Sequence, residues 1–523
     1  MHGATIRTTK SQGVIIFVKL AQTLAVFFLS WGCCAPCAAA DQYWGYQYKQ
    51  INVTAQGSSD FARNLAHNLY RLELAMAAIL QSDATWRPPI ELYAVPVGMF
   101  TELSGLQPDN GSQSKTTPYS SALLVNTTQS GALRYWSTYF SFGASMFITK
   151  YSSRYPAWFI SGMSEVMAAS SVEFGKVIIG GANPGRVYSL GHGSWIPLQL
   201  LLSVRGNDPQ MSSRAFLDMY FAETWYLVHK IIVDQFYHAN FYQYFLRLDK
   251  GEDESRAFAE SFAITYEDLN AALRKSITAD KFMHYSVKIP GDDDGSKPVR
   301  LSEAEALGRL AAYAGEHGVQ PERAMELSAA SLKLDPANED AKLGRVRAEL
   351  RAANRDAAVH DADEICDAPT LSAKVAATCA FAFTFVARNE SDKSSQAEQR
   401  AKALKFYEQT VRLEPGDLKS WYGMSVLVFD MHDVAYAKTF IPRFTAVRAE
   451  HANIGGLAGS LASLYSMVGD NDTAMKYAQA WQNHSISSQD KENAAVFIAR
   501  LKGANERKQA AGGVSAPDAH LAP

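Results

Sequence analysis

The sequence predicts an α+β domain followed by an all-α superhelix of paired helices. Strand-like and helix-like stretches alternate from residue 41 to about residue 290. Residues 301–504 are rich in alanine and have helical periodicity. An acidic stretch with Gly and Pro, residues 291–300, separates these two regions. We therefore divide the chain into a front block (residues 41–290), a linker (291–300) and a repeat block (301–504).

The overall composition excludes two classes of function. The chain has 523 residues, with 50 Lys+Arg against 53 Asp+Glu, so it lacks the basic excess typical of nucleic-acid-binding proteins. Its one uninterrupted apolar run is near the N-terminus, which excludes a multipass membrane protein. We expect no nucleic-acid partner.

Residues 1–40 have the pattern of a secretory signal peptide. Arg7, Lys10 and Lys19 precede the apolar run LAQTLAVFFLSW (residues 20–31), and small residues end at Ala40. We predict cleavage after Ala40 and a secreted or periplasmic mature chain. The alternative is an uncleaved signal that anchors the chain, which is the only membrane attachment that we expect; the run is short for a span of about 20 residues.

The front block is predicted to mix helices and strands. Helical spacing covers residues 59–80, 136–151, 157–170 and 213–237. β-rich stretches cover residues 90–97, 122–126, 177–179 and 187–190, the last two flanking an Asn-Pro-Gly turn.

The repeat block contains small residues at nearly regular intervals. Ala324, Ala357, Ala403, Ala437 and Ala474 each open the second helix of a predicted pair, at spacings of 33, 46, 34 and 37. These residues, with the phrases LKLDPAN and VRLEPGD, resemble the tetratricopeptide repeat, whose period is 34. The resemblance implies a superhelix with a groove for a protein or peptide partner. The alternative is an irregular helical bundle.

Two segments of the repeat block are expected to lack helix. Polar residues 389–399 account for the longest interval and are expected to form a loop. Residues 505–523, rich in Ala, Gly and Pro, are predicted to be a disordered tail.

Cys366 and Cys379 are the cysteines that remain after signal cleavage. An oxidising compartment favours a disulfide between them. We expect, however, a helical hairpin that turns at residues 367–370, which places Cys379 roughly 13 Å along the next helix at about 1.5 Å per residue. This separation exceeds the usual Cα distance of a disulfide. The sequence therefore predicts two buried thiols.

Four short sequence segments of the front block resemble segments of one protein family. They are YPAWFISGMSEV (residues 155–166), WIPLQLL (195–201), YFAETWYLVH (220–229) and AFAESFA (257–263). In this order and spacing they resemble secreted bacterial gluzincin-type (peptidase MA-like) metallopeptidase-like proteins, which are often fused to tetratricopeptide repeats. The resemblance covers residues 41–290 and implies a metallopeptidase-like fold.

The zinc ligands of such enzymes are missing. Active members carry HExxH on a helix, where two histidines bind zinc and the glutamate activates water. The resemblance sets Phe142 and Met146 on the histidine positions, Gly143 on the glutamate and Ser161 on the third ligand, while Glu165 is retained. HExxH occurs nowhere in the sequence. We therefore predict no catalytic residue, metal or cofactor, and a vestigial cleft of Phe142, Gly143, Met146, Trp158, Ser161, Glu165, Glu223 and His229.

Two other groups contain side chains that can ligate a metal. Asp234 and His238 lie four residues apart, and His360, Asp363 and Glu364 cluster near Cys366. Solvated charges on helix surfaces explain both groups more simply. A core histidine is likewise the simpler interpretation of His229.

These observations favour a secreted, non-catalytic pseudopeptidase that acts as a protein- or peptide-binding scaffold. Two alternatives remain open at this point. One is an active hydrolase that uses other residues, for instance Glu165 with His229 or Glu223 around a relocated metal. The other is a structural assembly factor in which only the repeats matter.

Overall fold

The structure is a computed structural model, and it describes most of the chain beyond the predicted signal peptide. The described residues are 42–80, 89–107, 111–117, 119–128, 140–141, 143–144, 155–173, 175–204, 208–249, 252–278, 282–289, 291, 295–368, 370–451, 454–485 and 488–512. The predicted signal peptide and its cleavage site lie outside these residues.

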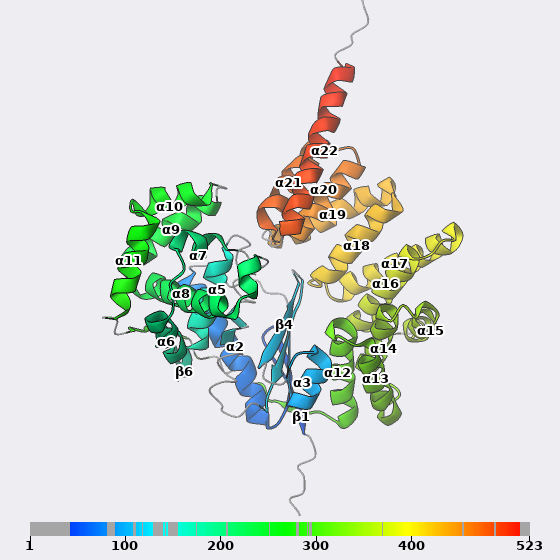
Figure 1. The fold of residues 1–523 in the computed structure, drawn as a ribbon. Helices are drawn as coiled ribbons and strands as arrows, with labels where there is room; N and C mark the ends of the chain where they lie inside the picture. The colour runs from blue at the N-terminus through cyan, green and yellow to red at the C-terminus, as the bar shows by residue number, and fades with distance from the viewer. Residues whose placement is uncertain are drawn as a thin grey trace, which may run out of the picture. The chain divides into compact units, whose positions relative to one another are not determined.

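A six-stranded mixed sheet begins the front block (Figure 1). Its order is β4-β5-β3-β2-β1-β9. The central strands β2, β3 and β5 run parallel, while β4 and β1 pair antiparallel with their neighbours. The bounds are β1 Tyr43–Tyr48, β2 Ile51–Gln56, β3 Ile90–Val95, β4 Ser112–Thr116, β5 Ser121–Asn126 and β9 Val299–Arg300.

The two faces of this sheet pack against different parts of the chain. Val53, Leu92 and Leu123 share one hydrophobic cluster with helix α2 (Ser59–Ile79). Tyr93 and Leu124, on the opposite face, pack with α3 (Val97–Ser104) and with α12 (Glu303–His317), the first helix of the repeat block. Because both faces are covered, the central strands are apolar on both sides.

The end of the predicted linker is part of the sheet. Its last residues form β9, which pairs antiparallel with Trp44 and Gly45 of β1. The hydroxyl of Ser296 also donates to the hydroxyl of Tyr46 at 3.1 Å. The described residues from Tyr43 onward form one compact unit, so the change in sequence character at 291–300 does not separate two independent bodies.

The rest of the front block is mainly helical. Its elements are α5 Ala157–Ala168, β6 Ser171–Glu173, β7 Lys176–Ile179, α6 Pro184–His192, α7 Leu198–Ser203, η1 Pro209–Ser212, α8 Arg214–Val233, α9 Gln235–Asp249, α10 Glu254–Phe262, α11 Tyr266–Ile277 and β8 Tyr285–Lys288. The strand predicted at residues 187–190 is wrong, because this stretch lies in α6. Asn183 caps that helix by accepting from the N–H of Arg186, and Pro184 starts it.

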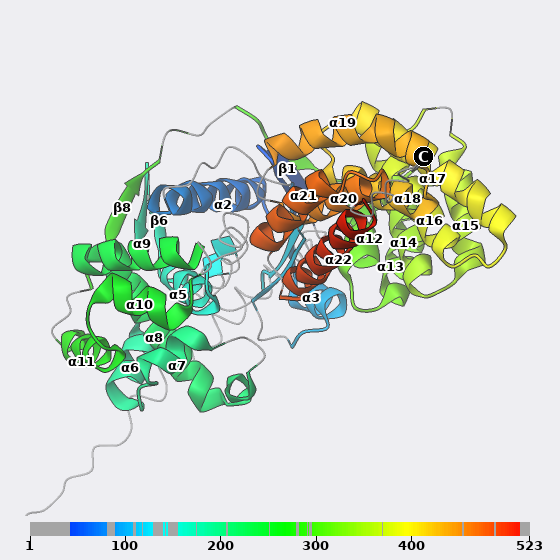
Figure 2. The ribbon, with the colours of Figure 1, turned by 90° about the horizontal axis from the view of Figure 1, so that it is seen from above.

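The repeat block consists of consecutive antiparallel helix pairs (Figure 2). The pairs are α12 with α13 (Pro321–Leu334), α14 (Glu339–Arg351) with α15 (Arg355–Cys366), α16 (Ala373–Arg388) with α17 (Lys393–Leu413), α18 (Leu418–Met431) with α19 (Val434–Glu450), and α20 (Gly455–Met467) with α21 (Asn471–His484), followed by α22 (Ser488–Gly512). Ala324, Ala403, Ala437 and Ala474 are fully buried in the second helices. In α15 the buried alanine is Ala358 and not Ala357, because Arg355 is the first helical residue and the buried position is the fourth.

Parts of two predicted irregular segments are helical instead, and residues 513–523 of the predicted tail lie outside the described residues. Residues 393–399, expected in a loop, extend α17 by about two turns, and the side chain of Asp392 caps the helix by accepting from the N–H of Ser395. Residues 505–512, expected in the disordered tail, belong to α22. Within the described part of the chain, no helix combines the length and the apolar character needed to cross a bilayer.

The predicted pair of free thiols is also wrong. Cys366 and Cys379 form a disulfide with a Cα–Cα distance of 6.1 Å. The two cysteines lie closer together than predicted because α16 begins only at Ala373, after a six-residue connection from α15. The connection lets the end of α15 lie beside the second turn of α16, where Cys379 is located.

Removing this disulfide should lower the stability of the chain. Because the bridge closes a loop between cysteines 13 positions apart, its loss in a Cys366→Ser/Cys379→Ser variant should reduce the free energy of unfolding by about 2 to 3 kcal/mol. Urea unfolding of both proteins measures this difference. Alkylation of the unfolded, unreduced wild type should label neither cysteine, and labelling of both would contradict the bridge.

Candidate functional site

The helix predicted to carry the lost zinc ligands is only partly described. Phe142 and Met146 lie outside the described residues, so their placement stays a prediction. Gly143 is buried against α2, where a Cβ atom would lie 2.9 Å from Leu69 Cδ1 and 3.3 Å from Leu72 Cδ2. The position that the family fills with glutamate therefore faces a tightly packed apolar surface.

Helix α5 carries three of the predicted cleft residues and crosses α8 very closely. Trp158 is fully buried and packs on the rings of Phe241 and Phe245, at centroid distances of 5.4 and 5.9 Å. At Gly162, one turn further on, a Cβ atom would lie only 2.3 Å from the carbonyl oxygen of Thr224. Trp158 thus belongs to the core, and Gly162 permits the helix crossing.

Ser161 and Glu165 each have a partner near the surface of this crossing. Glu165 receives two hydrogen bonds from Arg186 of α6, both of 2.9 Å, and the guanidinium also lies over the ring of Phe221 at 5.4 Å. Burial raises the pKa of Tyr220, and a hydrogen bond with Ser161 opposes that rise. Glu165 is therefore charge-compensated by an arginine.

Glu223 holds a loop in place. Its Oε1 accepts from the backbone N–H of Ile196 at 2.6 Å, and Arg274 of α11 donates to the neighbouring carbonyl of Trp195 at 3.3 Å. Burial raises the pKa of Glu223 to about 8, although the hydrogen bond from Ile196 and the charge of Arg274 act against the rise. The carboxyl group thus fixes the start of the WIPLQLL segment.

His229 belongs to an aromatic cluster. Its Nε2 lies 2.9 Å from the carbonyl oxygen of Met283, and because a carbonyl can only accept, Nε2 carries the proton. The rings of Trp225 and Phe282 lie within 5.9 Å of the imidazole. His229 and Glu223 are six positions apart on α8, so their side chains leave the helix about 120° apart. Among the described contacts, Glu165, Glu223 and His229 each bind a different segment and form no common hydrogen-bonded group.

The first alternative metal pair has structural roles. Asp234 precedes α9 and accepts from the N–H of Phe236 at 2.9 Å, as a capping residue does. Nδ1 of His238 lies 3.1 Å from the carbonyl oxygen of Ile231. Both residues form hydrogen bonds that stabilise the connection between α8 and α9.

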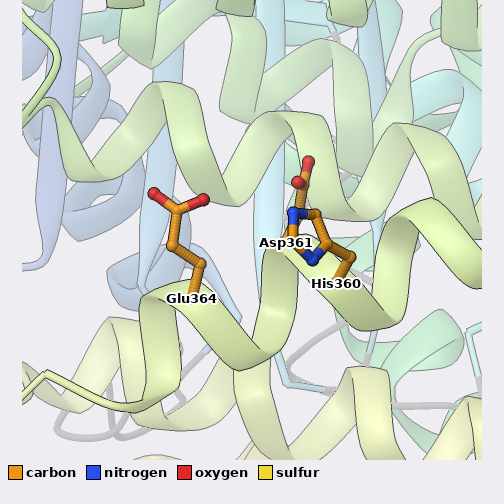
Figure 3. A group of neighbouring side chains, drawn as sticks. All are labelled: His360, Asp361 and Glu364. Atoms are coloured by element: carbon orange, nitrogen blue, oxygen red, sulfur yellow. The ribbon is translucent and has the colours of Figure 1, made fainter.

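The second group differs from the predicted one by one residue (Figure 3). His360, Asp361 and Glu364 place potential ligand atoms within 4.8 Å of one another, whereas Asp363 pairs with Lys402 at 3.4 Å. Asp361 faces α14, where it forms an ion pair with Arg345. Burial, followed by the charge of Asp361, raises the pKa of Glu349 on α14 to about 7. Because Arg345 already supplies positive charge, we assign no metal here.

A polar cluster joins four first helices of the repeat block. Arg347 of α14 donates to Glu316 of α12 at 2.6 Å and to Thr378 of α16 at 3.1 Å, and Lys419 of α18 also pairs with Glu316. Burial opposes ionisation of Glu316, but Arg347 and Lys419 outweigh burial and hold the pKa of Glu316 well below its usual range. Contact between the first and fourth of these helices requires the face that they share to be concave. We call this face, marked by Glu316, Arg347, Thr378 and Lys419, the inner face.

Aromatic side chains continue the inner face beyond this cluster. Phe381 follows Thr378 by three residues on α16, and Tyr422 follows Lys419 by three residues on α18, so each lies on the same side of its helix as the cluster. Phe429 follows Tyr422 by seven residues. The exposed fractions are 45% for Phe381, 36% for Tyr422 and 37% for Phe429. None of these three residues is predicted as a binding residue from the sequence, although their helical spacing from polar residues of the same helices is a usable signal.

Similarity to known proteins is found among solved structures. No family model and no curated protein matches the chain. One similar structure is that of a thermophilic TPR protein from Thermus thermophilus, with 15% identity and a TM-score of 0.31 over 38% of this chain and 100% of that chain.

Proposed function

We propose that this chain is a secreted, non-catalytic scaffold whose helical repeats bind a protein or peptide partner. The observation that carries the proposal is that Phe381, Tyr422 and Phe429, which their helical spacing places on the inner face, remain partly exposed to solvent. Exposed aromatic side chains on a concave surface are typical of protein-binding sites, because they bury much apolar area on association. A net charge of −3 adds no general attraction for nucleic acid.

The front block supports the non-catalytic part of the proposal. HExxH is absent from the sequence, and the remaining polar residues of the predicted cleft have structural partners: Arg186 for Glu165, the N–H of Ile196 for Glu223 and the carbonyl of Met283 for His229. We infer a degenerate metallopeptidase-like domain. The signal-like N-terminus and the Cys366–Cys379 disulfide both fit an oxidising compartment outside the cytoplasm.

Selection from a displayed random-peptide library tests partner binding. The wild type should enrich peptides that contain aromatic residues, and a Phe381→Ser/Phe429→Ser variant should bind those peptides at least about ten-fold more weakly, as expected when buried apolar contacts are lost. A matched control, Leu413→Ser/Val434→Ser, removes apolar side chains that are 52% and 40% exposed on second helices, and it should bind like the wild type. No enrichment, or equal losses in the two variants, would contradict the proposal.

Restoring the missing ligands tests the degenerate cleft. Phe142→His, Met146→His and Ser161→Glu together should create a site that binds about one zinc ion per chain, whereas the purified wild type should bind none. Gly143 should be left unchanged, because a side chain there would collide with Leu69. Metal analysis by mass spectrometry measures both values. A folded triple variant without zinc would argue against the family alignment.

A further inference from the structure

The inner face of the repeats is in contact with the front block's own sheet. Tyr119, in the connection between β4 and β5, stacks on Tyr422 of α18 with a centroid distance of 4.8 Å and an angle of 27° between the rings. The connection is closed by a hydrogen bond from the N–H of Thr117 to the carbonyl of Ser120 at 2.9 Å. Tyr119 therefore projects from a defined turn onto the aromatic surface described above.

The surface under Tyr119 is shaped to receive it. Gly456 lies in the first turn of α20, and a Cβ atom at this position would be only 2.3 Å from the Tyr119 hydroxyl oxygen. Any larger residue would displace the tyrosine. Burial raises the pKa of the Tyr119 hydroxyl well above its usual value. Tyr422 and Gly456 thus form a subsite for one aromatic ring.

Strand β4 follows the same face toward its other end. The hydroxyl of Tyr313 on α12 donates to Gln113 of β4 at 3.5 Å. Burial of the imidazole lowers the pKa of His317 on α12 to about 4, and the positive charge of Lys115 on β4 makes a smaller contribution in the same direction. The hairpin thus contacts α12 through its strand and α18 and α20 through its turn.

We infer that the β4–β5 hairpin is an intramolecular ligand of the inner face, with Tyr119 as its anchor in the subsite of Tyr422 and Gly456. A partner that uses this subsite must carry an aromatic residue in a turn or extended segment, and it must displace Tyr119. The contact of Tyr119 with its subsite lies within the chain, whereas its displacement by a partner rests on the proposed function. Together they make the hairpin a built-in competitor of the partner.

A short peptide copied from the hairpin provides the test. The probe is a fluorescein-labelled, cyclised peptide of residues 114–121 (SKTTPYSS), titrated against the full chain by fluorescence anisotropy. A Tyr119→Ala variant vacates the subsite and should bind the peptide at least ten-fold more tightly than the wild type. Tyr119→Phe keeps the ring in place and should bind as weakly as the wild type.

Two controls link the binding to this subsite. Adding Gly456→Val to the Tyr119→Ala variant fills the space beside the ring and should abolish peptide binding, and a peptide with alanine in place of its tyrosine should bind no variant. Circular dichroism confirms that each variant is folded. Equal affinities for wild type and Tyr119→Ala, or no binding to either, would overturn the inference, while the library selection with Phe381 and Phe429 would still decide the proposed function separately.

Discussion

Replacing Gly162 with valine should lower the free energy of unfolding by more than about 3 kcal/mol. The new Cβ atom would lie 2.3 Å from the carbonyl oxygen of Thr224 and 2.6 Å from Val228 Cγ2, so α5 and α8 must move apart. Overpacking of a rigid core costs about 1 to 3 kcal/mol and more where backbone atoms block relaxation. Moving the helices also loosens the fully buried Trp158 and Trp225, which lie on these two helices.

The matched control for this substitution is Gly191→Ala in α6. No atom lies within 4 Å of a Cβ built at Gly191, so this change should be neutral or slightly stabilising through helix propensity. Denaturant unfolding monitored by tryptophan fluorescence compares the variants with the wild type. A Gly162→Val protein as stable as the wild type would show that the crossing of α5 and α8 is not close.

Replacing Glu223 with glutamine should change how stability depends on pH. The pKa of Glu223 is about 8 in the folded chain, against an ordinary value of 4.5. Between these values the folded state keeps a proton that the unfolded state releases, so the wild type loses about 1.4 kcal/mol of stability per pH unit as the pH rises. Below pH 4.5 both states are protonated and the effect disappears.

Glutamine has no such proton, but its side-chain oxygen still accepts from the N–H of Ile196. The stability of Glu223→Gln relative to the wild type should therefore increase by about 3 kcal/mol between about pH 5 and pH 7.5. A control, Glu492→Gln at an exposed position of α22, should stay within about 0.5 kcal/mol of the wild type throughout. Parallel pH profiles for Glu223→Gln and the wild type would show that the carboxyl group is not desolvated.

Local signals in the sequence predicted much of the repeat block. Small residues such as Ala324 and Ala437 must be buried wherever two helices cross closely, so their spacing revealed the helix pairs. In α15 the spacing predicts Ala357, whereas the buried residue is Ala358. Two adjacent alanines satisfy the pattern, and only the helix start at Arg355 distinguishes them. Residues 393–399 are helical although the sequence predicts a loop, because an exposed helix and a loop have similar composition.

Features that depend on distant residues could not be predicted in this way. The ion pair of Glu316 with Lys419 joins residues 103 positions apart, and the Cys366–Cys379 disulfide depends on where α16 begins. In the front block, the roles of Glu223 and His229 depend on backbone groups of Ile196 and Met283, which no side-chain pattern identifies. The sequence therefore predicts which polar residues are buried in this region but not the backbone groups to which they bind.

The coverage of both sheet faces has a consequence for how this chain can be divided. A cut at residues 291–300 would strip α12 from the sheet and expose Tyr93 and Leu124 on one fragment and Leu310 on the other, all of which are buried in a shared cluster. Each fragment would expose an aggregation-prone apolar surface to solvent, and the front fragment would also lose its edge strand β9. We expect the two blocks to melt in a single transition, so neither behaves as a module that can be transplanted alone.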